Sequence, residues 1–427
     1  MRKSIKKLFS IALAAAMAVS VFTAASVSAD VDPDFKVGVI LVGDETEGYS
    51  KAHMDGISEA AAELGMDPSQ IMWKYKIPED SSCYDSAADF VGMGCDVVIS
   101  NSYGHQTYMV QAAMDYPDTT FVSMTGDFAA ISGCDNFKNA FTKVYESRYV
   151  SGVVAGLKLQ QLLDDGILTA EVQPDSFDAD GNIKIGYVGA YSYAEVVSGY
   201  TAFFLGVRSI VPNVVMEVLY TNSWFDIDKE AAAAEALIAN GNVIIAQHAD
   251  STGAPSSTQK LLDSGKICYS VGYNVDMLET APTAALTSAT NTWKVYYKHL
   301  FETAMNGEEI EADWAEGYNE DAVAITQLGE SCAEGTEEAV AETIEKLKSG
   351  EIKVFDTEAF TVGGEKVESC PVDLSFMDWS TNPPSVIYEG ETVEAIEDGQ
   401  FVESFYRSAP YFTLRIDGII EDADPVQ

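Results

Sequence analysis

Short apolar segments alternate with amphipathic segments along most of the chain, and the pattern is clearest between residues 184 and 250. There the apolar runs KIGYVGAY, VVMEVLY and NVIIAQ are separated by 3.6-residue repeats over residues 195–211 and 227–240. Short runs rich in β-branched and aromatic residues are typical of buried strands, whereas the longer repeats are typical of helices. This order of elements predicts a parallel sheet that is covered by helices on both faces.

The same alternation begins earlier in the chain, at residues 36–43. Two series of elements follow one another, and they are separated by an apolar helical pattern at 149–163 and a turn-rich stretch at 174–182. We therefore expect an α/β, two-lobed fold in which each lobe is a parallel sheet flanked by helices. The first lobe would comprise residues 30–150 and 292–320, and the second residues 151–291 and 321–380. From residue 352 onward the apolar segments KVFDTEAF, SVIYEG and FVESFYRSAPYFTLRIDG indicate strands, and a strand-rich C-terminal extension would follow lobe 2 at 381–427.

The first 29 residues have the pattern of an export signal. Four cations (Arg2, Lys3, Lys6 and Lys7) precede an apolar run that ends in Val27-Ser28-Ala29, and this order is typical of a cleaved signal peptide. The apolar run approaches the roughly 20 residues that span a bilayer, so a retained anchor is the alternative. Because the first cysteine is Cys83, we expect no lipid on a cysteine at the cleavage point. The expected location is extracytoplasmic.

The composition excludes several classes of function. With 25 Lys and Arg against 67 Asp and Glu, the chain repels nucleic acid, because phosphate binding needs clustered cations. The 47% of hydrophobic residues are enough for a packed core. The six cysteines and four histidines show no metal-ligand spacing, and no catalytic or phosphate-binding motif occurs. We therefore predict a monomeric binding protein without cofactor or metal, and not an enzyme.

Aromatic and polar side chains follow the predicted strands, and this is where small molecules bind in parallel α/β sheets. The aromatic candidates are Tyr49, Tyr103, Tyr191, Trp224 and Trp293. Flat rings at such positions suit stacking on a flat heterocycle, although they also suit packing between lobes. The polar candidates are Asn101, Gln247, Asp250, Asn274 and Asp276. These groups suit hydrogen bonds to ribose hydroxyls and base edges, or the capping of helices.

Several segments, in their order and spacing, resemble the basic membrane protein family of ABC-transporter substrate-binding proteins, of the purine nucleoside receptor type. They include KVGVILVG, VYESRYVSGVVAGL, KIGYVGAYSYAEVVSGYTAFFLGVRSIVPNV and VIIAQHADSTG, and the resemblance extends over about residues 36–379. It implies a type I periplasmic-binding-protein fold that closes on its ligand by a hinge motion. It further implies a purine nucleoside or nucleobase as ligand and an ABC permease as partner.

The sequence departs from this family at two expected binding segments. Gly48-Tyr49-Ser50 stands where the family has a Ser-Phe-Asn-like triplet, which adds Ser50 to the candidates. Residues 272–277 replace a GVDSDQ-like strand end, so that Asn274 stands in place of a carboxylate and Asp276 becomes the candidate for ribose. Two alternatives stay open: a cationic amine held by aromatic faces and carboxylates, and the ligand-sensing domain of a signalling system.

Overall fold

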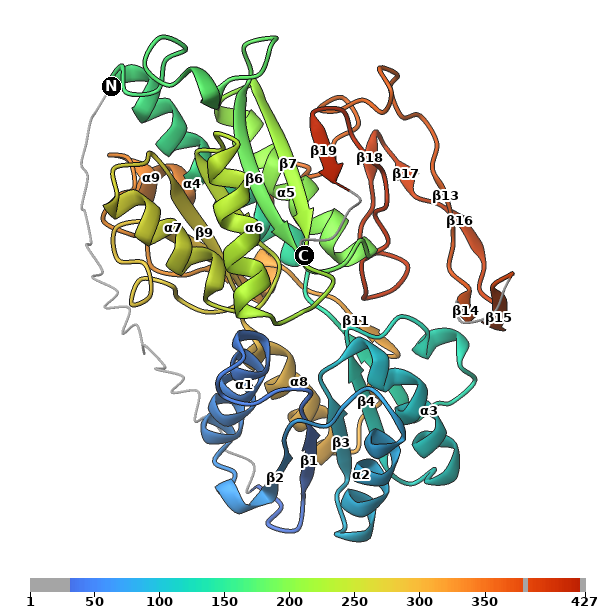
Figure 1. Cartoon of the computed structure of the whole chain (residues 1–427). Coiled ribbons are helices and arrows are strands. Elements are labelled where there is room, and N and C mark those ends of the chain that lie inside the picture. Colours follow the sequence, from blue (N-terminus) through green and yellow to red (C-terminus); the bar gives the residue numbers. More distant parts are fainter. Residues whose placement is uncertain (1–30, 379–382, 423–427) are drawn as a thin grey trace, which may run out of the picture.

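A computed structural model describes residues 31–378 and 383–422, which fold into two lobes built around separate sheets (Figure 1). The predicted export signal lies outside these residues. Within the described part, no helix is long and apolar enough to cross a membrane. The predicted two-lobed α/β fold is confirmed.

Lobe 1 contains a parallel sheet in the order β11-β5-β4-β3-β1-β2. Its strands are β1 (Val37–Ile40), β2 (Ile71–Lys74), β3 (Val97–Ser100), β4 (Thr120–Met124), β5 (Phe137–Ala140) and β11 (Asp313–Trp314). The helices are α1 (Gly48–Leu64), α2 (Ser81–Gly92), α3 (Gln106–Asp115) and α8 (Trp293–Asn306). Alternate side chains of β1 join different hydrophobic clusters, Val39 on the face of α1 and α8 and Ile40 on the face of α2 and α3. Burial of both faces explains the continuous apolar runs in the sequence.

Lobe 2 contains a sheet in the order β12-β10-β9-β8-β6-β7-β19, in which β12 pairs antiparallel with β10 and the other pairs are parallel. Its strands are β6 (Ile183–Gly189), β7 (Val214–Tyr220), β8 (Ile244–Gln247), β9 (Tyr269–Tyr273), β10 (Ala285–Asn291), β12 (Val323–Ile325) and β19 (Ile419–Asp422). The helices are α4 (Val144–Asp164), α5 (Ala194–Ile210), α6 (Ile227–Ala239), α7 (Gly253–Asp263) and α9 (Thr336–Lys348). The backbones of α4 and α5 pack closely, because a Cβ on Gly206 would lie 2.1 Å from the carbonyl oxygen of Tyr149.

The chain crosses between the lobes after β5, between β10 and α8, and between β11 and β12. These crossings agree with the predicted return of a late helix to lobe 1 and of later segments to lobe 2. The predicted residue boundaries of the lobes and of the extension remain a proposal that this arrangement supports.

The C-terminal part runs beside lobe 2 and reaches down to lobe 1 (Figure 1). It forms short paired strands: β13 (Pro371–Asp373), β14 (Phe376–Asp378), β15 (Ser385–Tyr388), β16 (Thr392–Glu394), β17 (Ile396–Glu397) and β18 (Gln400–Phe401). The strands predicted at 353–360 and over most of 401–418 are wrong. Most of their aromatic residues are buried singly instead, as when Phe355 stacks on Phe412 at 4.4 Å within the core of lobe 2, whereas Phe405 is exposed.

Candidate ligand-binding cleft

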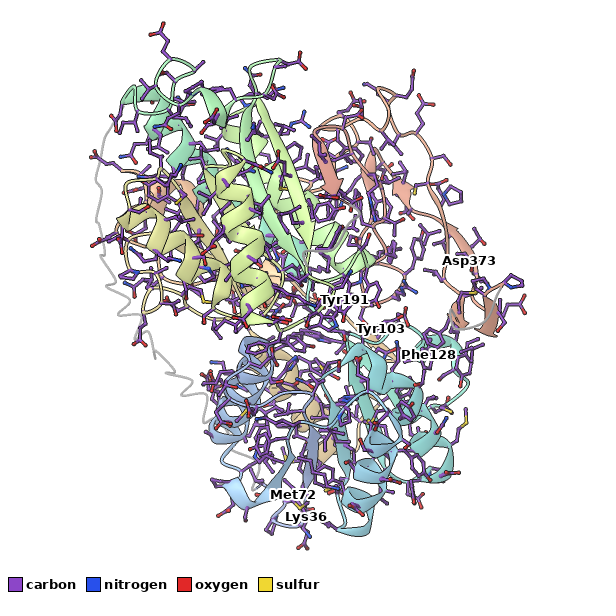
Figure 2. The ribbon with its side chains drawn as sticks, in the orientation of Figure 1. Lys36, Met72, Tyr103, Phe128, Tyr191 and Asp373 are labelled. Carbon is purple, nitrogen blue, oxygen red and sulfur yellow. The ribbon has the colours of Figure 1, made fainter. Side chains whose placement is uncertain are left out.

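A cavity of about 420 Å³ lies between the lobes, where the carboxyl ends of strands from both sheets face each other. Lobe 1 contributes the loops after β1, β2, β3 and β4, and lobe 2 contributes the loops after β6, β7 and β8 together with the end of β9. The cavity is large enough for a small heterocyclic ligand. Figure 2 shows Tyr191 of lobe 2 close to Tyr103 of lobe 1 at the junction of the lobes.

Six of the candidate residues line this cavity: Tyr49, Asn101, Tyr103, Tyr191, Trp224 and Asp250. They share one property, which is their place in a loop or helix start directly after a parallel strand. Since those strand ends meet at the junction of the lobes, residues far apart in the sequence come together in one site. The structure therefore places these six side chains around one cavity.

An aromatic cluster forms one wall of the cleft and involves both lobes. Tyr191 stacks on Tyr193 with ring centres 5.1 Å apart and an angle of 11° between the rings, and Trp224 meets Tyr191 edge to face at 5.3 Å. From lobe 1, Tyr103 lies 6.3 Å from Tyr193. Aromatic faces in this arrangement offer stacking to a flat ligand.

Carboxyl groups approach the cavity from the same loops. Glu47 caps α1, because its Oε1 accepts the Tyr49 N–H at 2.7 Å and its Oε2 accepts the Ser50 N–H at 2.8 Å. Asp250 Oδ1 accepts a hydrogen bond of 2.8 Å from the Asn274 side-chain amide. Glu195, in the first turn of α5, lies 3.2 Å from Nε2 of the buried His248.

Burial raises the pKa of each of these three acids. The pKa of Glu195 rises to about 7, against the attraction of the Arg148 guanidinium. Burial also raises the pKa of Glu47, in spite of its hydrogen bonds with Ser50 and Tyr49. The pKa of Asp250 lies well above its usual range because of burial and the nearby charges of Glu47, Glu230 and Glu195.

The charge of the cleft disfavours anions. Among the described residues, its lining includes five acidic side chains (Asp44, Glu47, Glu79, Glu195 and Asp250) and one lysine, Lys76. That lysine is already paired, with Nζ 2.5 Å from Asp44 Oδ2. A phosphate group would therefore meet carboxylates without an unpaired cation in the lining.

Trp293 and Ser50 lie outside the lining, and both have a structural role. Trp293 is 1% exposed and stacks on His53 at 4.3 Å, where it packs α8 against α1 beside Gly56. The Ser50 hydroxyl accepts hydrogen bonds from the Gly43 N–H and from the Asn101 side chain, which fix the loop after β1. The expectation that these two residues touch the ligand is corrected accordingly.

Three polar candidates are also displaced from the cavity. Gln247 donates its amide to the carbonyl oxygens of Ala249 and Ser251 and so holds the loop after β8. Asn274 has a positive φ of 62° and positions Asp250 through its amide. Asp276 is exposed, accepts the Leu278 N–H, and lines a separate groove beside α1. Gln247 and Asn274 therefore stabilise the loops around the cavity and do not line it.

The sequence interpretation missed the acids Glu47 and Glu195 and the ring of Tyr273, all of which line the cavity. Glu47 and Glu195 lie in the same strand-to-helix connections or helix starts as Tyr49 and Tyr191. A search for side chains that follow parallel strands would therefore have found them if charged residues had been included. Tyr273 is the last residue of β9 and stacks on the buried guanidinium of Arg148 at 3.7 Å. That long-range contact left no signal in the sequence.

Known proteins resemble this chain over most of its length. The model of the family described as ABC transporter substrate-binding protein, PnrA-like, matches residues 35–358. A purine-binding protein of Brucella abortus is 29% identical over 77% of this chain and 85% of its own length. A putative ABC transporter glucose-binding protein of Haloferax volcanii is also 29% identical, over 62% of this chain and 60% of its own length. A solute-binding protein structure from Aeropyrum pernix shares the fold, with a TM-score of 0.60, 16% identity, and coverage of 75% of this chain and 93% of that one.

Proposed function

The chain belongs to the PnrA-like family of ABC transporter substrate-binding proteins, and we propose that its cleft binds a purine nucleoside or nucleobase for delivery to an ABC permease. Such proteins act outside the cytoplasm, so the proposal includes residues 1–29 as the export signal and the mature protein as a monomer. The family assignment favours transport over the signalling alternative. It also agrees with a binding protein rather than an enzyme.

One observation carries the choice of ligand: aromatic rings and carboxyl groups from both lobes line the same cavity. A purine is flat and stacks on aromatic faces, while its N–H groups and the ribose hydroxyls donate hydrogen bonds to carboxylates. The purine-binding relative supports this choice. The glucose-binding relative, at the same identity, makes sugars a necessary comparison.

We assign stacking to Tyr191 and Trp224 and hydrogen-bond acceptance to Asp250. Asp250 lines the cavity and is held by Asn274, whereas Asp276 points to another groove. The role first expected for Asp276 therefore passes to Asp250. The loss of an acceptor for buried ligand donors costs roughly 1–3 kcal/mol, which is about 5- to 150-fold in affinity.

A cationic amine is the second candidate, and the excess of acids in the lining favours it. A cation over aromatic faces gains about 0.5–2 kcal/mol, and nearby carboxylates add to that. This candidate differs from a nucleoside in charge, so salt and pH separate the two. Amine binding should weaken steeply with ionic strength, whereas binding of a neutral nucleoside should not.

A thermal-shift screen of purine nucleosides, nucleobases, nucleoside monophosphates, sugars and amines tests the proposal. A ligand that binds only the native state stabilises it by about 2.7 kcal/mol at a hundredfold excess over the Kd. We expect inosine or a related purine to raise the Tm and its monophosphate to have little effect. A rise with sugars or amines but with no purine, or equal binding of the monophosphate, would contradict the proposal.

Titration calorimetry then compares two aspartates. Asp250→Asn should weaken purine binding by about 5- to 150-fold, whereas Asp276→Asn, the matched control, should leave it unchanged. Both variants keep the size of the side chain, so neither should disturb the packing. Circular dichroism checks that both variants are folded. Equal losses in the two variants would remove the assignment of Asp250.

A further inference from the structure

From here on, the C-terminal extension means the whole part of the chain after residue 358, where the match to the family model ends; residues 359–378 and 383–422 of it are described. It is anchored on lobe 2. Strand β19 pairs with β7 along Ile419–Asp422, and Glu421 accepts hydrogen bonds from the hydroxyls of Tyr200 and Tyr220. Arg415 bonds to Glu421 at 2.6 Å and to the Ser192 hydroxyl, next to the cleft residue Tyr191, at 2.9 Å. The extension is thus held on lobe 2 by strand pairing and by side-chain hydrogen bonds.

The same extension also contacts lobe 1. Phe128 of lobe 1 is 1% exposed and packs against Phe376 at 4.3 Å and Tyr388 at 4.9 Å (Figure 2 shows the position of Phe128). Nearby, Ser408 donates its N–H and its hydroxyl to Asp313, at 2.9 and 2.7 Å. The extension is therefore a link between the lobes in addition to the chain crossings.

Arg407 connects this link to the ligand cleft. Its Nη1 lies 3.4 Å from Asp127 Oδ2, with side chains only 15% and 11% exposed. The same Oδ2 accepts the Tyr103 hydroxyl at 3.1 Å, and the Tyr103 ring lines the cavity. We propose that Arg407 is a positioning residue that fixes Tyr103 in the cleft wall through Asp127, so that a segment outside the family's common part determines how well the cleft binds its ligand.

The electrostatics explain why Asp127 needs a cation. Burial raises the pKa of Asp127, and Arg407 is the strongest influence that opposes the rise. Without the guanidinium, this buried carboxylate takes up a proton more readily and is no longer a pure acceptor for the Tyr103 hydroxyl. The hydrogen bond that orients Tyr103 is then weaker, because a neutral carboxyl group is a poorer acceptor than a carboxylate.

The inference rests on the proposed binding site, so its test has one readout with ligand and one without. The ligand readout is the affinity for inosine, measured by calorimetry on the wild type, Arg407→Gln, Tyr103→Phe and the double variant. We expect Arg407→Gln to weaken inosine binding roughly tenfold in the wild-type background. In the Tyr103→Phe background the same substitution should weaken binding much less, because Arg407 acts on the ligand through the Tyr103 hydroxyl. Arg407→Lys should recover part of the affinity.

The second readout is amide hydrogen exchange of the ligand-free protein at residues 101–106. Arg407→Gln should accelerate exchange there, and Lys366→Gln, which breaks the exposed pair between Lys366 of the extension and Glu358, should not. The role of Arg407 would be overturned if Arg407→Gln left the exchange rates at 101–106 unchanged. It would also be overturned if Arg407→Gln lowered the affinity equally in the wild type and in Tyr103→Phe. If the wild type fails to bind inosine, the proposed ligand is wrong, and the exchange data alone decide on Arg407.

Discussion

Replacement of Glu195 by glutamine should stabilise the ligand-free protein at neutral pH. The Glu195 side chain is 17% exposed, lines the cleft, and faces the buried ring of His248. Burial raises its pKa from 4.5 to about 7, and the charge of Arg148 only partly opposes this. A glutamine has nearly the same shape and keeps a hydrogen-bonding group near His248 Nε2, but it carries no charge that must be desolvated.

The sign and the size follow from proton linkage. An acid whose pKa is higher in the folded than in the unfolded state binds its proton more tightly when folded, so its contribution to stability is fully present below about pH 4.5. That contribution is lost as the pH rises through about 7. A rise from 4.5 to about 7, at about 1.4 kcal/mol per unit, corresponds to a loss of about 3 kcal/mol at most. The partial exposure of the side chain reduces this, and we expect a gain of about 1–3 kcal/mol in the variant at pH 8.

Urea unfolding of the ligand-free wild type and of Glu195→Gln between pH 5 and pH 8 measures this effect. Glu230 and Glu403 also have a pKa raised to about 7 by burial, so both proteins should lose stability as the pH rises. The informative quantity is therefore the difference between the two proteins, which should grow with pH. The exposed Glu279→Gln variant is the control and should show a constant difference. A constant difference for Glu195→Gln as well would refute the reasoning.

Three further predictions concern packing and stacking. Trp293→Ala should lower the free energy of unfolding by about 3–5 kcal/mol, because it removes a buried ring between α1 and α8, while calorimetry should show unchanged purine affinity of the folded protein. Gly206→Ala should destabilise the protein in urea by about 1–3 kcal/mol, since its Cβ would lie 2.1 Å from a carbonyl oxygen of α4. Trp224→Ala should weaken purine binding by more than about 1 kcal/mol with little change in unfolding; the reverse pattern would make Trp224 a packing residue.

The sequence predicted the elements well wherever local periodicity determines them. The helix expected at 195–211 is α5, Ala194–Ile210, and the helix expected at 227–240 is α6, Ile227–Ala239. The apolar side of each helix faces a sheet, so the spacing of apolar residues in the sequence is enough to locate the helix. The segments at 353–360 and 401–418 failed because aromatic residues buried one at a time give the same local pattern as a strand.

The site was predictable only as far as the ends of the strands. Asp250 and Tyr191 lie directly after strands, and the meeting of strand ends brings them to the cavity. Trp293 also lies at the start of an element, but its environment is set by Gly56 and His53, more than 200 residues away. No local pattern distinguishes a ring that stacks on a ligand from a ring that packs one helix on another.

The acids of the cleft connect binding to folding. Glu47, Asp250 and Glu195 are buried together, and their raised pKa values mean that their charged forms destabilise the empty protein at neutral pH. A ligand that donates hydrogen bonds stabilises those charged forms, so binding offsets a penalty that the empty cleft carries. The same penalty rejects phosphates, because an anion would add to the repulsion. Replacement of Glu195 or Asp250 by the matching amide should therefore make the empty protein more stable and its binding weaker, whereas a change at an exposed acid should alter neither property.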